Sequence, residues 1–366
     1  RKKSVQTTGN DMTKKWIIAG IFLSCIVFAG CGKIFKEKNQ TNSEEIMPDK
    51  YIVVGFSQLG AESDWRSANT ESMKSTFTNE NGFELIFEDG QQKQSNQIMA
   101  IRTFIQQEVD YIVLAPVIET GWDTVLQEAK DAGIPVIIVD RMVDVEDESL
   151  YTAWVGSDFA LEGARAGEWI NQFLQVKKID NANIVNIQGT LGASAQIGRT
   201  KGLREACKAN ANTTLLTEVT GDFTQTKGKE VMESLLKKYD DINIVYCEND
   251  NEAFGVIEAI EATGKKVGSD IARGDIMVIS FDGVKKEAMD YILKDKITCI
   301  VECNPLQGPL VQDIILQLEA GEIPDKFSYV DEGMYAHDDT VLSVVIDGVD
   351  YPITVVTQEL LDVRAY

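Results

Sequence analysis

The strongest constraint on the fold is a regular alternation of short apolar segments with longer amphipathic segments, which begins at residue 51. The segments Tyr51–Phe56 and Val136–Val139 are apolar without alternation, a pattern typical of strands that are buried on both faces. Between such segments, Ile98, Ile101 and Ile105 recur at helical spacing and mark the core face of a helix. Strands and helices in this order predict an α/β fold with parallel sheets.

The same pattern runs along the chain twice, which predicts two doubly wound, Rossmann-like lobes joined near Gly156-Ser157. Near the end, Asp347-Gly348 stands between two apolar runs and predicts a β-hairpin. Strands are expected at 51–56, 83–87, 111–115, 135–139, 151–155, 184–187, 215–219, 244–247, 276–281 and 297–302. Helices are expected at 65–79, 95–108, 121–132, 158–174, 195–209, 226–239, 251–263 and 306–318.

The first thirty residues predict a targeting segment. They hold five basic residues and one acidic residue, and their apolar run, Trp16–Ala29, is short for a permanent membrane span. The run ends in Phe28-Ala29-Gly30-Cys31, which resembles the lipobox of bacterial lipoproteins, where the Cys is diacylated and becomes the new N-terminus. We therefore interpret 1–30 as a lipoprotein signal peptide cleaved before Cys31, with 1–11 as a non-native extension, and 31–50 as a flexible tether. A plain signal peptide or an anchor helix stays open as an alternative.

The charge balance and the rarity of histidine exclude several classes of function. The chain has 58 acidic and 35 basic residues, a formal net charge of −23, and a body with this field repels nucleic acid. The single histidine, His337, argues against multi-histidine zinc sites and against most histidine-based catalysis, so no metal and no cofactor is expected.

The spacing of the four cysteines after the leader defines neither a zinc site nor a disulfide, and we expect buried free thiols at Cys207, Cys247, Cys299 and Cys303.

Polar and aromatic residues gather directly after the predicted strands, which is where ligands bind in open parallel sheets. These positions hold Asp, Asn, Arg, Thr and aromatic side chains and few activated nucleophiles. Carboxylates and guanidinium groups form charge-assisted hydrogen bonds with hydroxyl groups, and aromatic faces cover the apolar side of a sugar ring. The set therefore favours a neutral polyhydroxyl ligand.

The post-strand segments contain motifs that resemble those of one known family in sequence and in order: Val54–Arg66, Asp89–Gln97, Ala115–Trp122, Asp140-Arg141, Gly189–Ser194, Gly221–Glu233 and Asn249-Asp250. On these residues the stretch from about 51 to 325 resembles the type I periplasmic sugar-binding proteins of ABC transporters, and most closely the galactofuranose-binding branch. The resemblance implies a type I periplasmic binding protein fold, whose lobes are joined by a three-stranded hinge and close around a sugar. It assigns 51–156 plus about 296–324 to the N-terminal lobe and about 157–295 plus 325–366 to the C-terminal lobe.

The resemblance also implies which residues contact the sugar, by hydrogen bonds and by aromatic ring faces. Ordinary structural roles stay open at these positions: an N-cap for Ser63 or Asp64, an inter-lobe ion pair for Asp140-Arg141, and core packing for Phe223. The expected ligand contacts are Glu62, Ser63, Asp64, Trp65, Arg66, Asp140, Arg141, Thr190, Arg199, Phe223, Asn249, Asp282 and Glu302.

These inferences predict a monomeric, extracytoplasmic lipoprotein, anchored to the membrane through Cys31 and without enzymatic activity. It would capture a monosaccharide, galactofuranose or a related pentose or hexose, and deliver it to the permease subunits of an ABC sugar importer. A binding protein that reports the sugar to a histidine kinase or chemoreceptor is the main alternative. A glycosidase is disfavoured because only burial would separate the pKa values of a pair such as Glu62 and Asp140. A LacI-type repressor is disfavoured because a lipidation signal takes the place of its DNA-binding domain.

Overall fold

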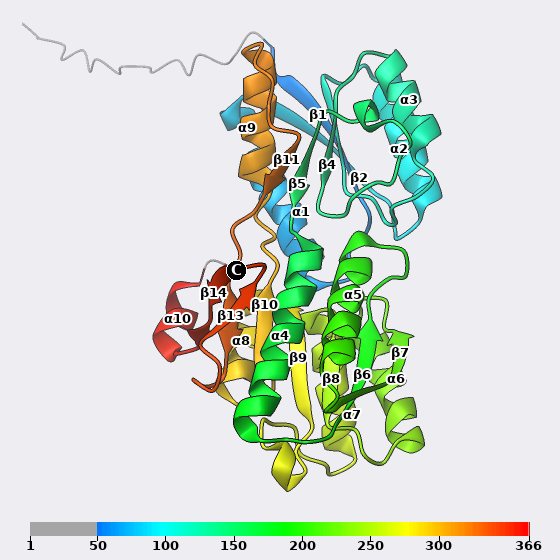
Figure 1. Cartoon of the computed structure of the whole chain (residues 1–366). Helices are drawn as coiled ribbons and strands as arrows, with labels where there is room; N and C mark the ends of the chain where they lie inside the picture. The colour runs from blue at the N-terminus through cyan, green and yellow to red at the C-terminus, as the bar shows by residue number, and fades with distance from the viewer. Residues whose placement is uncertain (1–49, 365) are drawn as a thin grey trace, which may run out of the picture. The chain divides into compact units, whose positions relative to one another are not determined.

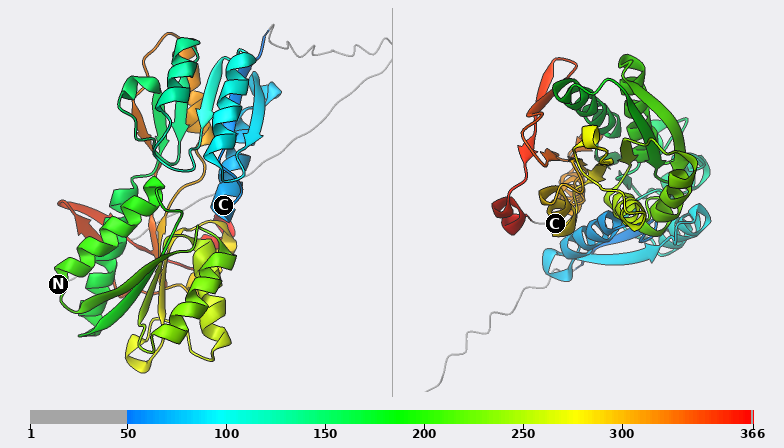
Figure 2. Two further views of the ribbon diagram at one scale, coloured as in Figure 1. Left: turned by 90° about the vertical axis from the view of Figure 1, so that its right-hand side faces the viewer. Right: turned by 90° about the horizontal axis from the view of Figure 1, so that it is seen from below.

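The computed structural model describes residues 50–364 and 366 and arranges most of their strands in two sheets, each with helices on both faces (Figures 1 and 2). The first sheet has the strand order β11-β5-β4-β3-β1-β2, and every adjacent pair in it is parallel. Its strands are β1 (Ile52–Gln58), β2 (Phe83–Asp89), β3 (Tyr111–Leu114), β4 (Val136–Val139), β5 (Ala153–Gly156) and β11 (Phe327–Tyr329). The helices of this lobe are α1 (Asp64–Thr76), α2 (Gln94–Gln106), α3 (Asp123–Asp131) and α9 (Gly308–Glu319), with 3-10 turns at Asn79–Asn81 and Glu148–Leu150.

Successive side chains of the central strands explain why helices cover both faces of this sheet. Ile137 on β4 packs in a core with Met73 of α1 and Ile315 of α9. The next residue, Ile138, packs on the opposite face with Phe104 of α2. Because side chains alternate along a strand, an apolar residue at every position requires a hydrophobic layer on each side. The α/β fold class with two parallel-sheet lobes is therefore confirmed.

The second sheet has the order β15-β12-β10-β9-β8-β6-β7 and is parallel except where β12 runs antiparallel to β10. Its strands are β6 (Ala182–Gln188), β7 (Thr213–Thr220), β8 (Ile244–Cys247), β9 (Met277–Asp282), β10 (Cys299–Glu302), β12 (Met334–Ala336) and β15 (Thr354–Val355). One face is covered by α4 (Phe159–Lys177) and α5 (Ser194–Ala209). The other is covered by α6 (Gln225–Lys238), α7 (Asp250–Ala262), α8 (Lys285–Leu293) and α10 (Gln358–Val363), and a 3-10 turn spans Ile271–Arg273.

Within the described residues, the predicted order of strands and helices is confirmed, apart from the helices α8 and α10 and the strands β11 and β12, which the sequence pattern did not reveal. The second apolar run beside Asp347-Gly348, 351–356, is divided between β14 and β15. β11, β12 and β15 are two or three residues long, too short for a recognisable period, and they form because other strands offer them hydrogen bonds. The hairpin was predicted correctly: β13 (Ser343–Ile346) and β14 (Val349–Pro352) flank Asp347-Gly348, whose φ angles of 51° and 82° fit a primed turn.

Between residues 50 and 364 the chain crosses between the sheets three times, at 157–158 after β5, at 303–307 after β10 and at 330–333 after β11. Two strands lie in the opposite sheet from the one expected, which corrects the predicted lobe boundaries. The N-terminal lobe was expected to include all of 296–324, but β10 pairs in parallel with β9 of the second sheet. The C-terminal lobe was expected to include 325–366, but β11 pairs with β5 of the first sheet. The second crossing comes later than expected because β10 keeps its register with β9 up to Glu302.

The predicted leader 1–30, the predicted lipidation site Cys31 and the predicted tether up to residue 49 lie outside the described residues. Among residues 50–364 and 366, none of the helices combines the length and the apolarity needed to cross a membrane. Cys247, Cys299 and Cys303 are buried free thiols, as expected, whereas the free thiol of Cys207 is only partly buried.

Candidate functional site

A cavity lies between the carboxyl ends of strands from both sheets. Ten of its thirteen lining residues are among those expected from the sequence. The lining comes from the segments after β1 and β4 in the first lobe, from α4, α5 and the ends of β7, β8 and β9 in the second, and from the second crossing. The lining residues are Glu62, Ser63, Trp65, Arg66, Asp140, Arg141, Phe159, Ala195, Arg199, Phe223, Asn249, Asp282 and Cys303.

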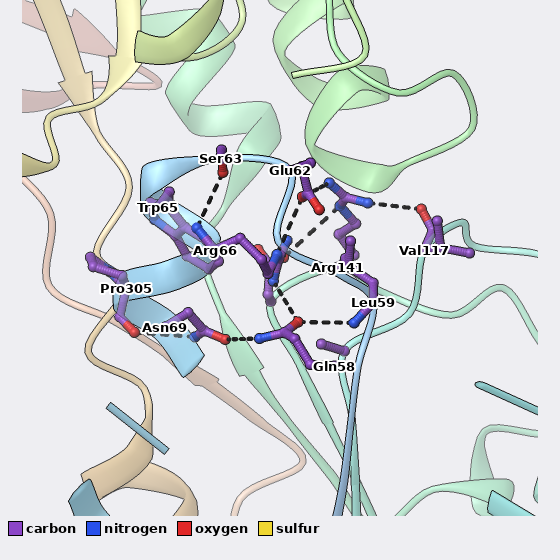
Figure 3. A network of polar contacts seen from close by, with 12 residues as sticks. Gln58, Leu59, Glu62, Ser63, Trp65, Arg66, Asn69, Val117, Arg141 and Pro305 are labelled. Atoms are coloured by element: carbon purple, nitrogen blue, oxygen red, sulfur yellow. Dashed lines mark hydrogen bonds and ion pairs between the residues drawn. The ribbon is translucent and has the colours of Figure 1, made fainter. Parts of the chain in front are cut away.

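Two arginines and two carboxylates form a buried network on the first-lobe wall (Figure 3). Arg141 donates from Nη2 to Glu62 Oε1 at 2.9 Å, and Arg66 Nε lies 3.3 Å from the same oxygen. Arg66 Nη2 lies 2.5 Å from Asp140 Oδ2. The four side chains are only 3–5% exposed. Because each charge has an opposite partner, the network offsets the cost of burial and fixes the orientation of every group.

One oxygen of this network lacks a partner. Glu62 Oε2 is buried and accepts no hydrogen bond from the described residues, although Oε1 of the same carboxylate contacts two guanidinium groups. A buried acceptor left without a donor costs about 1–3 kcal/mol, and more when it is charged. Because Glu62 lines the cavity, its carboxylate is a candidate acceptor for a hydroxyl group there.

The start of α1 brings an aromatic face to the same wall. Ser63 caps this helix, since its Oγ accepts from the backbone N–H of Arg66 at 3.1 Å. Trp65, two residues after Ser63, donates from Nε1 to the carbonyl of Cys303 at 2.7 Å, which holds the ring against the second crossing. The N-cap role foreseen for Ser63 thus coexists with a place on the cavity wall.

Arg199 is the central cation of the second-lobe wall. Its Nε lies 2.7 Å from Glu162 Oε2, and its Nη2 lies 3.4 Å from Asp282 Oδ1. Burial acts to lower the pKa of Arg199, but the charges of Glu162 and Asp282 raise that pKa well above its ordinary value. The carboxyl of Asp282 shows the reverse balance: burial raises its pKa well above the usual range, although the charge of Arg199 lowers it.

Phe223 provides an aromatic face opposite the first-lobe wall. The Arg141 guanidinium carbon lies 5.1 Å from the centre of its ring, a cation–π distance that spans the two lobes. Asn249 caps α7 by accepting from the Glu252 N–H at 2.8 Å, and it donates to the Phe223 carbonyl at 3.0 Å. Gly189 leaves room for the ring, because a Cβ there would lie 1.9 Å from it.

Three lining residues have a left-handed backbone, which is uncommon for residues that carry a side chain. The φ angles are 62° at Asp140, 60° at Phe223 and 92° at Asp282. Asp282 is the last residue of β9, whereas Asp140 follows β4 and Phe223 follows β7. At each of these three positions the left-handed backbone ends the extended conformation of the strand, and the residue lines the cavity. Strain of this kind gathers at functional sites.

Three of the expected ligand residues lie outside the cavity lining. Asp64 accepts from Nδ2 of Asn251 at 3.3 Å, and its N–H donates to the same amide at 2.9 Å, so it joins the two lobes. Thr190 is half-buried in the turn before α5, where its carbonyl accepts from the Ala193 N–H. Glu302 is buried at the end of β10 and bonds to the far side of the second sheet.

Three lining residues were not foreseen: Phe159, Ala195 and Cys303. Cys303 directly follows Glu302, and the alternation of side chains along β10 could have identified it. Ile300 packs on the face covered by α8 and α10, so Glu302 belongs to that face and the next residue to the opposite one. Phe159 and Ala195 stand in the first turns of α4 and α5, and only the packing of the lobes brings them to the cavity.

The cavity offers hydrogen-bond donors, hydrogen-bond acceptors and aromatic ring faces. Burial raises the pKa of Cys303 well above its ordinary value, which keeps the thiol protonated and a poor nucleophile.

Within the described residues, Glu162, Cys303 and Glu332 bring atoms that could bind a metal ion within 4.8 Å of one another. Arg199, at 2.7 Å from Glu162, supplies positive charge there already, so the group does not suit a metal ion.

Comparisons with known proteins agree with this geometry. Residues 54–322 match the family model of the periplasmic binding protein domain. The galactofuranose-binding protein YtfQ of Escherichia coli K12 is 42% identical over 293 residues, which cover 78% of this chain and 88% of that protein. A Mycobacterium smegmatis crystal structure in complex with β-D-fucofuranose is 42% identical with a TM-score of 0.74, covering 79% of this chain and 92% of that one. The periplasmic component of an arabinose ABC transporter from Shewanella sp. ANA-3, bound to α- and β-L-arabinofuranose, is 38% identical with a TM-score of 0.72, covering 79% and 93%.

Proposed function

Because this chain belongs to the periplasmic binding protein family, we propose that its cavity captures one monosaccharide in the furanose form and presents it to an ABC sugar importer. The proposal covers the ligand, the ring form, the transporter and the membrane anchor. The relatives are named as binding proteins, and a role in binding rather than catalysis follows for this chain.

The observation that carries the proposal is the buried oxygen of Glu62 that lacks a donor. Glu62 lines the cavity beside Arg66, Asp140 and Arg141, and the positions of these side chains are fixed by their mutual ion pairs. A sugar hydroxyl donates to a carboxylate and accepts from a guanidinium group, so adjacent hydroxyls fit this alternation of acceptors and donors.

The aromatic lining of the cavity favours a sugar ring. Trp65, Phe159 and Phe223 supply apolar faces for the C–H side of a ring. Support for the furanose form comes from the relatives, since the three named above bind galactofuranose, fucofuranose or arabinofuranose.

Contacts between the lobes support capture by closure. Glu119 N–H donates to the Gly192 carbonyl at 3.0 Å, and Met142 N–H donates to Ser194 Oγ at 2.9 Å. Each contact joins a first-lobe loop to the turn or first residue of α5, and in the described part of the chain three crossings connect the lobes. A hinge motion about these crossings would open the cavity to admit the sugar.

The membrane anchor and the monomeric state belong to the same proposal. Cys31 would be diacylated after cleavage of 1–30, and 31–50 would hold the folded lobes near the membrane surface. Labelling of cells with radioactive palmitate should mark the protein and should fail for Cys31→Ser. Equal labelling of both proteins would contradict lipidation at this residue.

Titration calorimetry of the purified protein with L-arabinose, D-galactose and D-fucose tests the sugar and its ring form. These sugars mutarotate, so only a small fraction of each dissolved sugar is in the furanose form. A furanose-specific site binds that fraction at once and then binds further sugar only as fast as pyranose converts to furanose. We expect this slow second phase for at least one sugar and the return of intact sugar on denaturation. Chemical turnover, or the absence of binding to all three, would contradict the proposal.

A further inference from the structure

Glu302 was expected to contact the sugar, yet it serves a different part of the molecule. We define the C-terminal arm as α10 with the residues that follow it, 364 and 366. Arg364 Nη2 lies 2.6 Å from Glu302 Oε1, and the Tyr366 hydroxyl donates to the same oxygen at 2.7 Å. The second oxygen, Oε2, accepts from the Gly333 N–H at 2.7 Å. Glu302 therefore fixes the arm against the end of β10.

Arg364 uses its remaining hydrogen-bonding capacity on the backbone next to the cavity. Its Nε and Nη2 donate to the Gly283 carbonyl at 2.9 and 2.6 Å. The side chain is only 6% exposed, and Glu302 neutralises its charge. A guanidinium group that contacts one carbonyl twice holds the position and the direction of that carbonyl.

The carbonyl that Arg364 holds belongs to the turn that presents Asp282 to the cavity. Asp282 and Gly283 have consecutive positive φ angles, 92° and 70°. On its other side the turn is held by Asp250, whose carboxylate accepts from the Val284 N–H at 3.0 Å. An Asp residue is strained at this φ, so the conformation persists only while neighbouring groups impose it.

We propose that Arg364 is a positioning residue of the sugar site, which acts by holding the Asp282-Gly283 turn so that Asp282 faces Arg199 and the cavity. The inference rests on the proposed function and extends it to residues beyond 322, where the matched family model ends. It gives the C-terminal arm a part in sugar affinity although no arm residue lines the cavity.

The affinity test uses Arg364→Gln, Arg364→Lys and the control Arg204→Gln in the full protein with L-arabinose. Arg204 forms an exposed bidentate pair with Glu218 in the same lobe, so its replacement removes a similar ion pair away from the cavity. We expect Arg364→Gln to weaken binding about tenfold, Arg364→Lys to restore part of that loss, and the control to bind like the wild type. Wild-type affinity of Arg364→Gln would overturn the proposal and leave the proposed function standing.

A double-mutant cycle separates positioning from a general loss of stability. If Arg364 acts through Asp282, Arg364→Gln should add little to the affinity loss of Asp282→Asn, whereas it should add in full to that of Asp140→Asn. Full additivity with both would overturn the proposal. If Arg364→Gln does not fold, Glu302→Gln takes its place in the same cycle, since it removes the carboxylate that anchors the arginine.

Hydrogen exchange supplies a readout that needs no sugar. In Arg364→Gln the Val284 amide should exchange faster than in the wild type, while the amides of α4 should keep their rates. Unchanged exchange at Val284 would overturn the proposal even if the protein bound no sugar, so failure of this inference is distinguishable from failure of the proposed function.

Discussion

Asp140→Asn is expected to weaken sugar binding about thirtyfold while preserving the fold. The carboxylate of Asp140 is 5% exposed and lies 2.5 Å from Arg66 Nη2 on the cavity wall. Asn has the same shape and tolerates the φ of 62° found at this position, so the backbone stays in place. Hydrogen bonds to charged groups are worth about 1.5–3 kcal/mol and neutral ones about 1 kcal/mol. The difference is roughly 0.5–2 kcal/mol for each bond. When two hydroxyls share the carboxylate, a loss of about 2 kcal/mol results, which corresponds to a factor of about thirty.

Titration calorimetry with L-arabinose measures this loss, and circular dichroism checks that the variant is folded. Asp131→Asn is the matched control, because it makes the same chemical change on the exposed end of α3. The control should bind like the wild type. A folded Asp140→Asn variant with wild-type affinity would refute the reasoning and remove Asp140 from the site.

Three other perturbations probe the packing of the cavity, the closure of the lobes and a buried carboxyl. Gly189→Ala places a Cβ 1.9 Å from the Phe223 ring and forces the ring to move. Calorimetry should then show sugar binding at least about tenfold weaker, and unchanged affinity would contradict the role of the ring. Ser194→Ala removes the 2.9 Å hydrogen bond from the Met142 N–H. Stopped-flow fluorescence should then show faster sugar release, and an unchanged rate would mean that this contact does not hold the lobes closed. Burial raises the pKa of Glu332 to about 9, so the folded state keeps a proton that the unfolded chain loses near the ordinary carboxyl pKa. The free energy of unfolding, measured with urea, should then fall between pH 6 and pH 8.5 by up to about 1.4 kcal/mol per pH unit; Glu332→Gln should flatten this fall, and an equally steep fall in that variant would contradict the assignment.

Much of the fold was predictable because its signals are local. A strand such as Val136–Val139 shows its burial in its own four residues, and Asp347-Gly348 shows its turn in two. The candidate site was predictable for a related reason: residues that directly follow parallel strands meet at one edge of the sheet, whatever the distant contacts are. Asp140 and Asp282 follow this rule.

The parts that sequence reasoning did not identify depend on contacts between distant residues. Glu302 ends a parallel strand as Asp282 does, but its side chain meets Arg364 on the far face of the sheet. Phe159 reaches the cavity only because the first crossing directs α4 toward the other lobe. The lobe boundaries were misplaced for the same reason, since the pairing of β10 with β9 is a property of the assembled sheet.

A crystal structure of the protein grown with L-arabinose would show directly whether the cavity holds a furanose. We predict one furanose ring between the lobes, with a hydroxyl oxygen about 2.5–2.8 Å from Glu62 Oε2 and further hydroxyls on Asp140 and Arg199. A pyranose ring in the cavity would contradict the assigned ring form. Sugar bound elsewhere, with Glu62 Oε2 still lacking a donor, would contradict the account as a whole.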